Sequence, residues 1–204
     1  MLQMKLGFAS LLLLATQAGA ATISIDFETL PNGNPVAAGT EITNQYASLG
    51  VLFESTNTSS GAVQITNVLD VTPTPSSPNY LAPGGPLPNN GGTLVLDFTT
   101  LVKEVGSFFI GDAFPVQVTA YDSSNSIVGV VASDGAGSVG PTDDWIILHS
   151  QGIARVELAG GFFAPDQPDG WGIDDLRFVP VPEPGTLSLF AICIGITLSR
   201  VLRK

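Results

Sequence analysis

Four carboxylates near the two ends of the central part of the sequence could bind a metal ion. Asp26 and Glu28 alternate along the stretch TISIDFET, and Asp174 and Asp175 are adjacent in GIDDLRFVP. Calcium takes six to eight oxygen ligands, and carboxylates are common donors to it. If these stretches are the first and last strands of one sandwich, the side chains meet, because domain termini commonly lie close together. The alternative is that the carboxylates cap loops or solvate a strand edge.

Other residues match enzyme patterns, but each pattern lacks a necessary neighbour. Asp143 and Asp144 are adjacent, so on a strand they face opposite sides and form no acid–base pair by themselves. His149 is the only histidine, and no G-x-S-x-G motif accompanies it. The stretch GAGSVG, residues 135–140, matches a dinucleotide fingerprint, but Pro141 follows it instead of a helix. We therefore expect no enzymatic activity; the alternative is a secreted carbohydrate-active enzyme whose carboxylate pair comes from distant strands.

Aromatic side chains could bind sugars, because a flat ring can stack on the apolar face of a pyranose. Tyr80 lies in the proline-rich stretch 73–92, which we interpret as a long surface loop, and we predict that it contacts a glycan. Phe163 and Trp171 are instead expected to pack in the core. The remaining candidates for a sugar platform are Tyr121, Trp145 and Phe162.

Residues 21–180, which we call the body, are strongly acidic. Only Glu183 of the 18 acidic residues lies outside the body, which therefore has 17. The cations of the body are Lys103, Arg155 and Arg177, so its formal charge is 3 minus 17, or −14. Phosphate backbones attract clusters of Lys and Arg, so we expect no nucleic-acid partner. The single cysteine, Cys193, lies outside the body, which therefore forms no internal disulfide. Such acidity suits an exported protein or one that binds cations.

Short alternations of apolar and polar residues recur along the body between Gly-, Pro- and Ser-rich turns. This period of two is typical of strands in an all-β sandwich. One stretch, residues 39–50, has instead the spacing of a helical turn that ends at Gly50. The pattern predicts about ten strands, over residues 22–29, 50–55, 62–70, 93–98, 105–112, 116–122, 127–133, 145–150, 153–160 and 172–180.

Both ends of the sequence have the composition of targeting segments. Residues 1–20 resemble a signal peptide, with Lys5 before an apolar stretch and small residues up to Ala20. Residues 186–202 are mostly apolar and just long enough for a transmembrane helix. The basic end would remain in the cytoplasm and leave the body outside, because cytoplasmic flanks are enriched in cations. The residues of this basic end are Arg200, Arg203 and Lys204.

The last 24 residues, VPEPGTLSLFAICIGITLSRVLRK, resemble the PEP-CTERM sorting signal of Gram-negative bacteria. The resemblance rests on three parts in order: a Pro-Glu-Pro motif, an apolar helix and a basic end. It implies recognition by the membrane enzyme exosortase, cleavage near the motif, and passage from an inner-membrane precursor to the cell surface or exopolysaccharide matrix. The segment also carries the name "ice-binding protein C-terminal domain", but the body lacks a Thr-x-Thr ladder for an ice-facing array. The motif residues are Val181, Pro182, Glu183 and Pro184.

The body is similar, more loosely, to β-sandwich ectodomains that accompany this signal. The resemblance rests on the strings IDFETLPNG, ITNQYASLGVLFES, YLAPGG, VTAYDSS and GWGIDDLRF. It implies a jelly-roll-like sandwich akin to carbohydrate-binding modules, with a structural calcium ion near the termini by analogy. We therefore predict an exported, non-enzymatic protein that binds polysaccharide; a calcium-dependent adhesin is a further alternative.

Overall fold

The computed structural model shows Ala20–Val181 as one compact unit. The predicted signal peptide, except Ala20, and the predicted transmembrane helix and basic end lie outside the described residues, as do Glu183 and Pro184 of the sorting motif. The part of the chain that the structure describes includes no helix long and apolar enough to cross a membrane. The described residues are 20–56, 63–66, 75–76, 78–83, 92–110, 115–135, 145–160 and 171–182. For residues 162–164 and 167–168 only the backbone is described.

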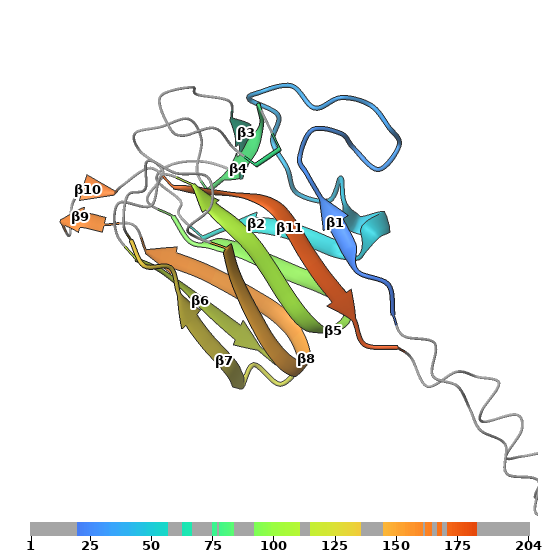
Figure 1. Ribbon diagram of the computed structural model, residues 1–204, viewed down its shortest axis with the longest axis vertical. Helices are drawn as coiled ribbons and strands as arrows, with labels where there is room; N and C mark the ends of the chain where they lie inside the picture. Colours follow the sequence, from blue (N-terminus) through green and yellow to red (C-terminus); the bar gives the residue numbers. More distant parts are fainter. Residues whose placement is uncertain are drawn as a thin grey trace, which may run out of the picture. The chain divides into compact units, whose positions relative to one another are not determined.

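The described fold is all-β, as the alternating pattern predicts (Figure 1). Every strand pair is antiparallel, and nine strands join in one hydrogen-bonded sheet with the central order β3-β4-β11-β5-β8-β6-β7. In addition, β1 pairs with β11, β2 pairs with β5, and β9 and β10 form a separate pair. The strands are β1 (Ile23–Ile25), β2 (Val51–Ser55), β3 (Gln64–Thr66), β4 (Tyr80–Ala82), β5 (Leu94–Ile110), β6 (Val116–Tyr121), β7 (Ile127–Ala132), β8 (Trp145–Gly160), β9 (Phe162–Ala164), β10 (Gln167–Pro168) and β11 (Gly172–Pro180).

Two long strands connect the layers of this sandwich-like sheet. The sequence predicts four short strands where the structure has only β5 and β8, with 17 and 16 residues. The register between them shifts on both sides of Val102, where bulges bend the pair. Before the bend β5 pairs with β2, and after it with β11. One continuous strand therefore contributes to both layers, because a bulge changes its direction without breaking the ladder.

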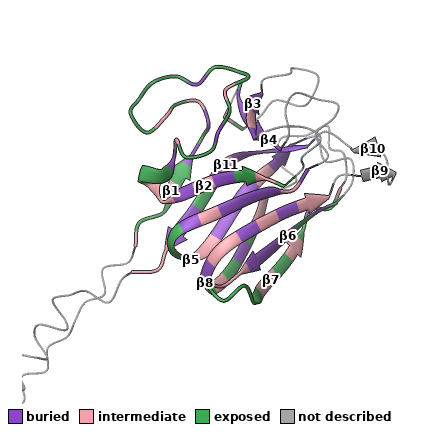
Figure 2. Cartoon of the chain, turned by 180° about the vertical axis from the view of Figure 1, so that it is seen from behind, coloured by how far each residue is buried: buried purple, intermediate pink, exposed green. Residues whose placement is uncertain are grey.

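The core lies between the layers and is built from alternate residues of the strands (Figure 2). Phe27, Tyr46 and Phe53 form an edge-to-face cluster with ring centroids 6.0–6.1 Å apart. All three are at most 1% exposed. Burial of such a side chain stabilises the fold by roughly 1.5–3 kcal/mol, so this cluster ties the irregular segment between β1 and β2 to the sheet.

The helical turn predicted over residues 39–50 is mostly wrong. Only Ala47–Leu49 forms a turn of 3₁₀ helix, labelled η1, and Gly50 closes it at φ 100° as expected. The Thr40 hydroxyl donates to the main-chain oxygen of Ala37. Main-chain bonds from this segment go to β2 and to the β3 region, so pairing with strands replaces the helix.

Candidate functional site

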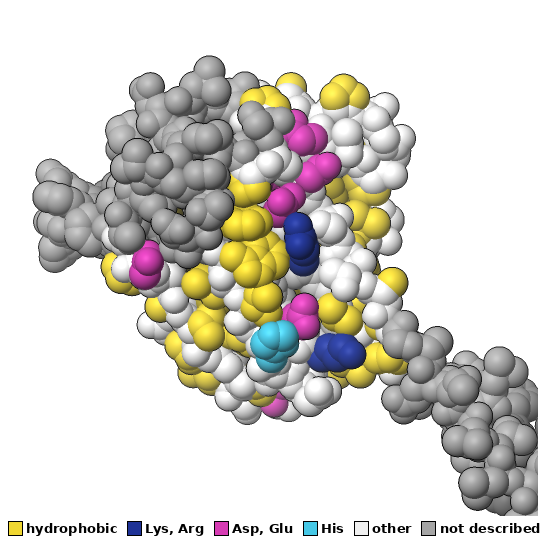
Figure 3. All heavy atoms as spheres, viewed as in Figure 1, with side chains coloured by type: hydrophobic (Ala, Val, Ile, Leu, Met, Phe, Trp, Pro, Cys, Tyr) yellow, Lys and Arg dark blue, Asp and Glu magenta, His cyan; other side chains and the backbone are white. Residues whose placement is uncertain are grey.

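An aromatic pair lies on the outer face of the layer formed by β11, β5 and β8. Phe108 and Trp145 are partners in the β5–β8 register, so their side chains point to the same side of the sheet. Their ring centroids are 4.7 Å apart, the planes are tilted by 54°, and both residues are partly exposed. Hydrophobic side chains gather near the centre of this face, bordered by acidic and basic groups (Figure 3).

The indole of Trp145 lies against a glycine of the neighbouring strand. A Cβ atom added to Gly106 would be 3.1 Å from Cζ2 of Trp145 and 3.0 Å from the main-chain oxygen of Ile146. Since the glycine presents no side chain, the ring can approach the backbone of β5 closely. The Trp145 ring therefore packs directly against the backbone at Gly106.

Arg177 of β11 covers part of this aromatic surface. Its Cζ atom is 4.9 Å from the centre of the Trp145 ring, which is cation–π distance. Its Nη2 atom is 3.8 Å from Oδ2 of Asp175, too far for a hydrogen bond. Arg177 thus brings a half-exposed cation over the Trp145 ring, and the largely buried carboxylate of Asp175 lies next to that cation.

A β-bulge puts Arg177 on this face. Asp174 is the register partner of Phe108, whereas Arg177 is the partner of Gly106, so three steps on β11 match two steps on β5. In a regular strand, residues three apart face opposite sides. Asp175 takes the extra position with φ 50°, a left-handed conformation that aspartate tolerates better than most residues.

The edge of the face carries an exposed histidine beside a carboxylate. Nδ1 of His149 is 3.3 Å from Oε2 of Glu104, and the His149 side chain is 67% exposed. Ile147, between this pair and the rings, is 37% exposed. The outer face therefore combines apolar surface with hydrogen-bonding groups, an arrangement that suits the binding of a ligand.

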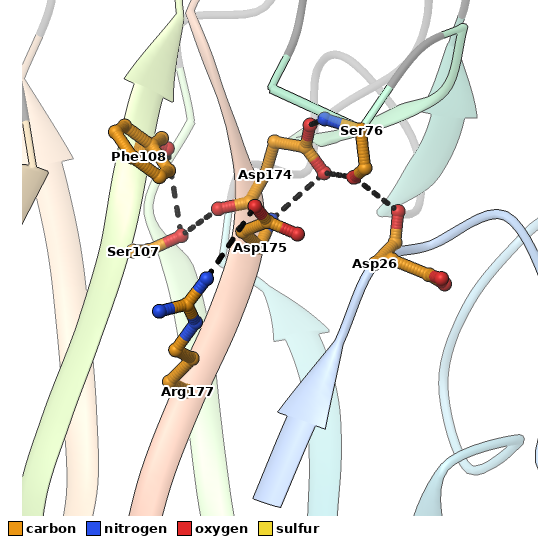
Figure 4. A network of polar contacts seen from close by, with 7 residues as sticks. All are labelled: Asp26, Ser76, Ser107, Phe108, Asp174, Asp175 and Arg177. Carbon is orange, nitrogen blue, oxygen red and sulfur yellow. Dashed lines mark hydrogen bonds and ion pairs between the residues drawn. The ribbon is translucent and has the colours of Figure 1, made fainter. Parts of the chain in front are cut away.

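A second cluster surrounds the buried carboxylate of Asp174 (Figure 4). The Ser76 main-chain N–H donates to Oδ2 at 2.9 Å and the Ser76 hydroxyl to Oδ1 at 2.8 Å, while the same hydroxyl is 3.1 Å from the main-chain oxygen of Asp26. The N–H of Asp175 donates to Oδ1, and the Ser107 hydroxyl to the Asp174 carbonyl. Burial raises the pKa of Asp174 to about 7, although the hydrogen bonds oppose this shift.

The four predicted calcium ligands do not converge as four side chains. Glu28 accepts hydrogen bonds from the main-chain N–H and the amide of Asn79, and the Asp26 side chain caps the N–H of Glu28. Asp175 faces Arg177. Within the described residues, no group of three or more His, Cys, Asp or Glu side chains is placed to hold a metal ion. The oxygens that do meet are the Asp174 carboxylate, the Ser76 hydroxyl and the Asp26 carbonyl.

The prediction that Tyr80 presents its ring to a glycan is wrong. Tyr80 lies in β4 and is 2% exposed, because its ring packs against the backbone of Gly172 on β11. The local sequence does not indicate this burial, because the polar or turn-forming residues Ser77, Pro78 and Asn79 precede the short strand and are typical of a loop. Trp171 is fully buried beside Phe109, which confirms that prediction. The Phe163 side chain lies outside the described part.

The sequence indicates one member of the aromatic face, Trp145, as a candidate sugar platform. It does not single out Phe108 or Arg177. The alternation along VGSFFIGD could have indicated Phe108. On a regular strand Gly106 and Phe108 share one face, and Val105, Ser107 and Phe109 share the other. No local signal places Arg177, since its direction depends on the bulge at Asp175.

No protein-family model and no curated protein matches the chain. Solved structures that resemble it include the K2 cleaved adhesin domain of Lys-gingipain, at 13% identity and a TM-score of 0.46, covering 78% of this chain and 99% of that one. A family 29 carbohydrate-binding module matches at 9% identity and a TM-score of 0.32, covering 78% and 89%. The C-terminal family 6 carbohydrate-binding module of a marine laminarinase from Zobellia galactanivorans matches at 14% identity and 0.31, covering 63% and 98%. Likenesses this distant say nothing about what the present chain binds.

Proposed function

We propose that this chain is an exported, non-enzymatic protein of the cell surface or extracellular matrix whose body binds polysaccharide. The observation that carries the binding proposal is the outer face with Phe108, Trp145 and Arg177, where partly exposed rings adjoin hydrogen-bonding groups. Such a surface combines partly exposed aromatic rings for apolar contact with a pyranose and donors and acceptors for its hydroxyls. The proposal of export through exosortase rests on the motif that begins at Val181.

Binding can be tested with the full-length chain, purified in detergent and applied to a glycan array. We expect Trp145→Ala to weaken binding to any recognised glycan at least tenfold, or about 1.4 kcal/mol, because it removes the larger ring. Tyr121→Ala is the matched control: that ring lies on β6 of the other layer, 5.9 Å from the guanidinium carbon of Arg155. Unchanged binding by the Trp145 variant would contradict the assignment of the site.

Calcium is proposed as a structural ligand at the Asp174 cluster. The Asp174 carboxylate, the Ser76 hydroxyl and the Asp26 carbonyl are hard oxygen donors within one small region and would supply part of the six to eight oxygen ligands that calcium takes. The described residues place no cationic side chain within ion-pair distance of Asp174. Burial and, to a lesser extent, the nearby charges of Asp26 and Glu28 raise the pKa of Tyr46 to about 12.

Thermal unfolding of the unit Ala20–Val181 in calcium chloride and in EDTA tests this site. A calcium concentration a hundredfold above Kd should stabilise the fold by about 2.7 kcal/mol and raise Tm by several degrees. Asp174→Asn should abolish the response, while Asp97→Asn, on the other layer, should leave it intact. A wild-type Tm indifferent to EDTA would remove calcium from the proposal.

A further inference from the structure

The polar groups of the aromatic face bear on which kind of polysaccharide it accepts. Arg177 supplies a planar set of N–H donors, and Asp175 supplies two acceptor oxygens. The 3.8 Å between Nη2 and Oδ2 exceeds hydrogen-bonding distance, so the pair does not use up its own capacity. Among the described residues, the other close partner of Arg177 is the ring of Trp145, which takes no hydrogen-bond acceptor away.

A donor and an acceptor side by side match two neighbouring sugar hydroxyls. Each hydroxyl both donates and accepts, so one can accept from Arg177 while the next donates to Asp175. A carboxylate or sulfate on the sugar would instead gain from Arg177 and be repelled by Asp175. The bulge therefore favours an uncharged partner, because the cation that it brings to the Trp145 ring has the carboxylate of Asp175 next to it.

The negative charge of the body also favours an uncharged polymer as the partner. A formal charge of −14 repels a polyanion approaching any face, and Arg155 is engaged by Glu157 and Asp97 on the other layer. On the aromatic face the charge of His149, when protonated, is balanced by Glu104. Lys103 of β5 forms no ion pair among the described residues, but with Arg177 it makes only two Lys or Arg cations in the described part of this layer, too few to compensate an acidic polymer.

We propose that the face of Phe108, Trp145, Asp175 and Arg177 binds a neutral hexose polysaccharide, with Arg177 and Asp175 holding vicinal hydroxyls beside the aromatic surface. This inference rests on the proposed polysaccharide binding and adds the class of ligand and the two residues that select it. Phe108 and Trp145 provide the apolar contact, which every pyranose shares. The donor–acceptor pair provides the selection against uronate and sulfated polymers.

The test is affinity electrophoresis of the full-length chain in detergent through gels that contain one polymer each. The neutral set is an α-glucan, a β-glucan and a galactomannan, and the acidic set is polygalacturonate and alginate. We expect retention by at least one neutral polymer, none by the acidic ones, and less than a twofold change in affinity between about 50 and 500 mM NaCl, because no counterions are released.

Variants separate this inference from the proposed function. Arg177→Gln and Asp175→Asn should each weaken retention at least tenfold, whereas Arg155→Gln on the other layer should change it less than twofold. Asn keeps the tolerance of position 175 for positive φ, and Asp175→Gly serves as a second variant should the first unfold. Circular dichroism melting checks that each variant is folded.

Three outcomes of these gels would contradict part or all of the proposal. Preferential retention by acidic polymers, lost at high salt and in Arg177→Gln, overturns the neutral ligand while polysaccharide binding stands. Binding that needs Trp145 but survives both polar variants overturns the role of Arg177 and Asp175 alone. Retention by no polymer of either set overturns the inference and the proposed function together.

Discussion

Asp174 shows how one buried residue can govern stability as a function of pH. Its side chain is 0% exposed and lies where the segment containing Ser76 meets β1 and β11. Burial raises its pKa from 3.8 to about 7, so the folded chain retains a proton that the unfolded chain releases. Stability is therefore greatest below the unfolded value and falls as pH rises through this window.

We expect the free energy of unfolding of Ala20–Val181, without calcium, to fall between about pH 4 and pH 7. The contribution of Asp174 to this fall is on the order of 4 kcal/mol at most, from the two pKa values. Asp174→Asn should remove this contribution, because its amide does not titrate. Urea titrations at several pH values measure the difference between the two proteins; parallel curves would contradict the raised pKa.

At the scale of elements, the contact of β4 with β11 depends on a glycine. A Cβ atom at Gly172 would be 2.5 Å from Cδ2 of Tyr80 and 2.7 Å from the main-chain oxygen of Leu81. Neither the buried ring nor the backbone can move far, so the pairing of Ile173 with Leu81 requires this close approach. Among the described strands β3 pairs with β4 alone, so the same glycine supports both short strands.

Gly172→Ala should destabilise the unit Ala20–Val181 by about 2–3 kcal/mol or more, because overpacking here meets backbone atoms. Gly39→Ala is the control, since nothing lies within 4 Å of its added Cβ and only its positive φ, 84°, carries a cost of about 1 kcal/mol. Urea midpoints compare the two. A Gly172 variant as stable as the Gly39 variant would show that β4 can shift freely.

At the scale of the whole molecule, the end of the body leads directly into the proposed sorting motif. The N–H of Val181 donates to the main-chain oxygen of Leu101 at 2.7 Å, so the first motif residue still belongs to the compact unit. The prolines that follow disfavour helix in the residues before them, which suits an extended recognition segment.

Replacing Pro182, Glu183 and Pro184 with alanines should leave an uncleaved precursor in the inner membrane. Membrane fractionation and the mass of the surface-exposed product measure this outcome. Trp145→Ala is the matched control, since it alters the proposed binding face and should be processed normally. Unchanged mass and delivery of the alanine variant would refute the sorting proposal.

The fold class and most strand positions follow from the sequence by itself. The period-two alternation is a local property, so it predicts β6, β7 and β11 to within a residue or two; the loop YDSSNS joins β6 and β7 in a hairpin. The Asp122 side chain accepts from two main-chain N–H groups of that loop, and Asn125 adopts φ 63°, as such residues allow.

Only the tertiary structure decided the composition of the candidate sites. Tyr80 is buried because β11 packs over it, and Arg177 reaches Trp145 because one bulge reverses the facing of its strand. Likewise, Asp174 meets a serine 98 positions earlier in the chain. Alternation records which residues share a face of a regular strand, but bulges and long-range packing depend on partners far along the chain, which local sequence does not contain.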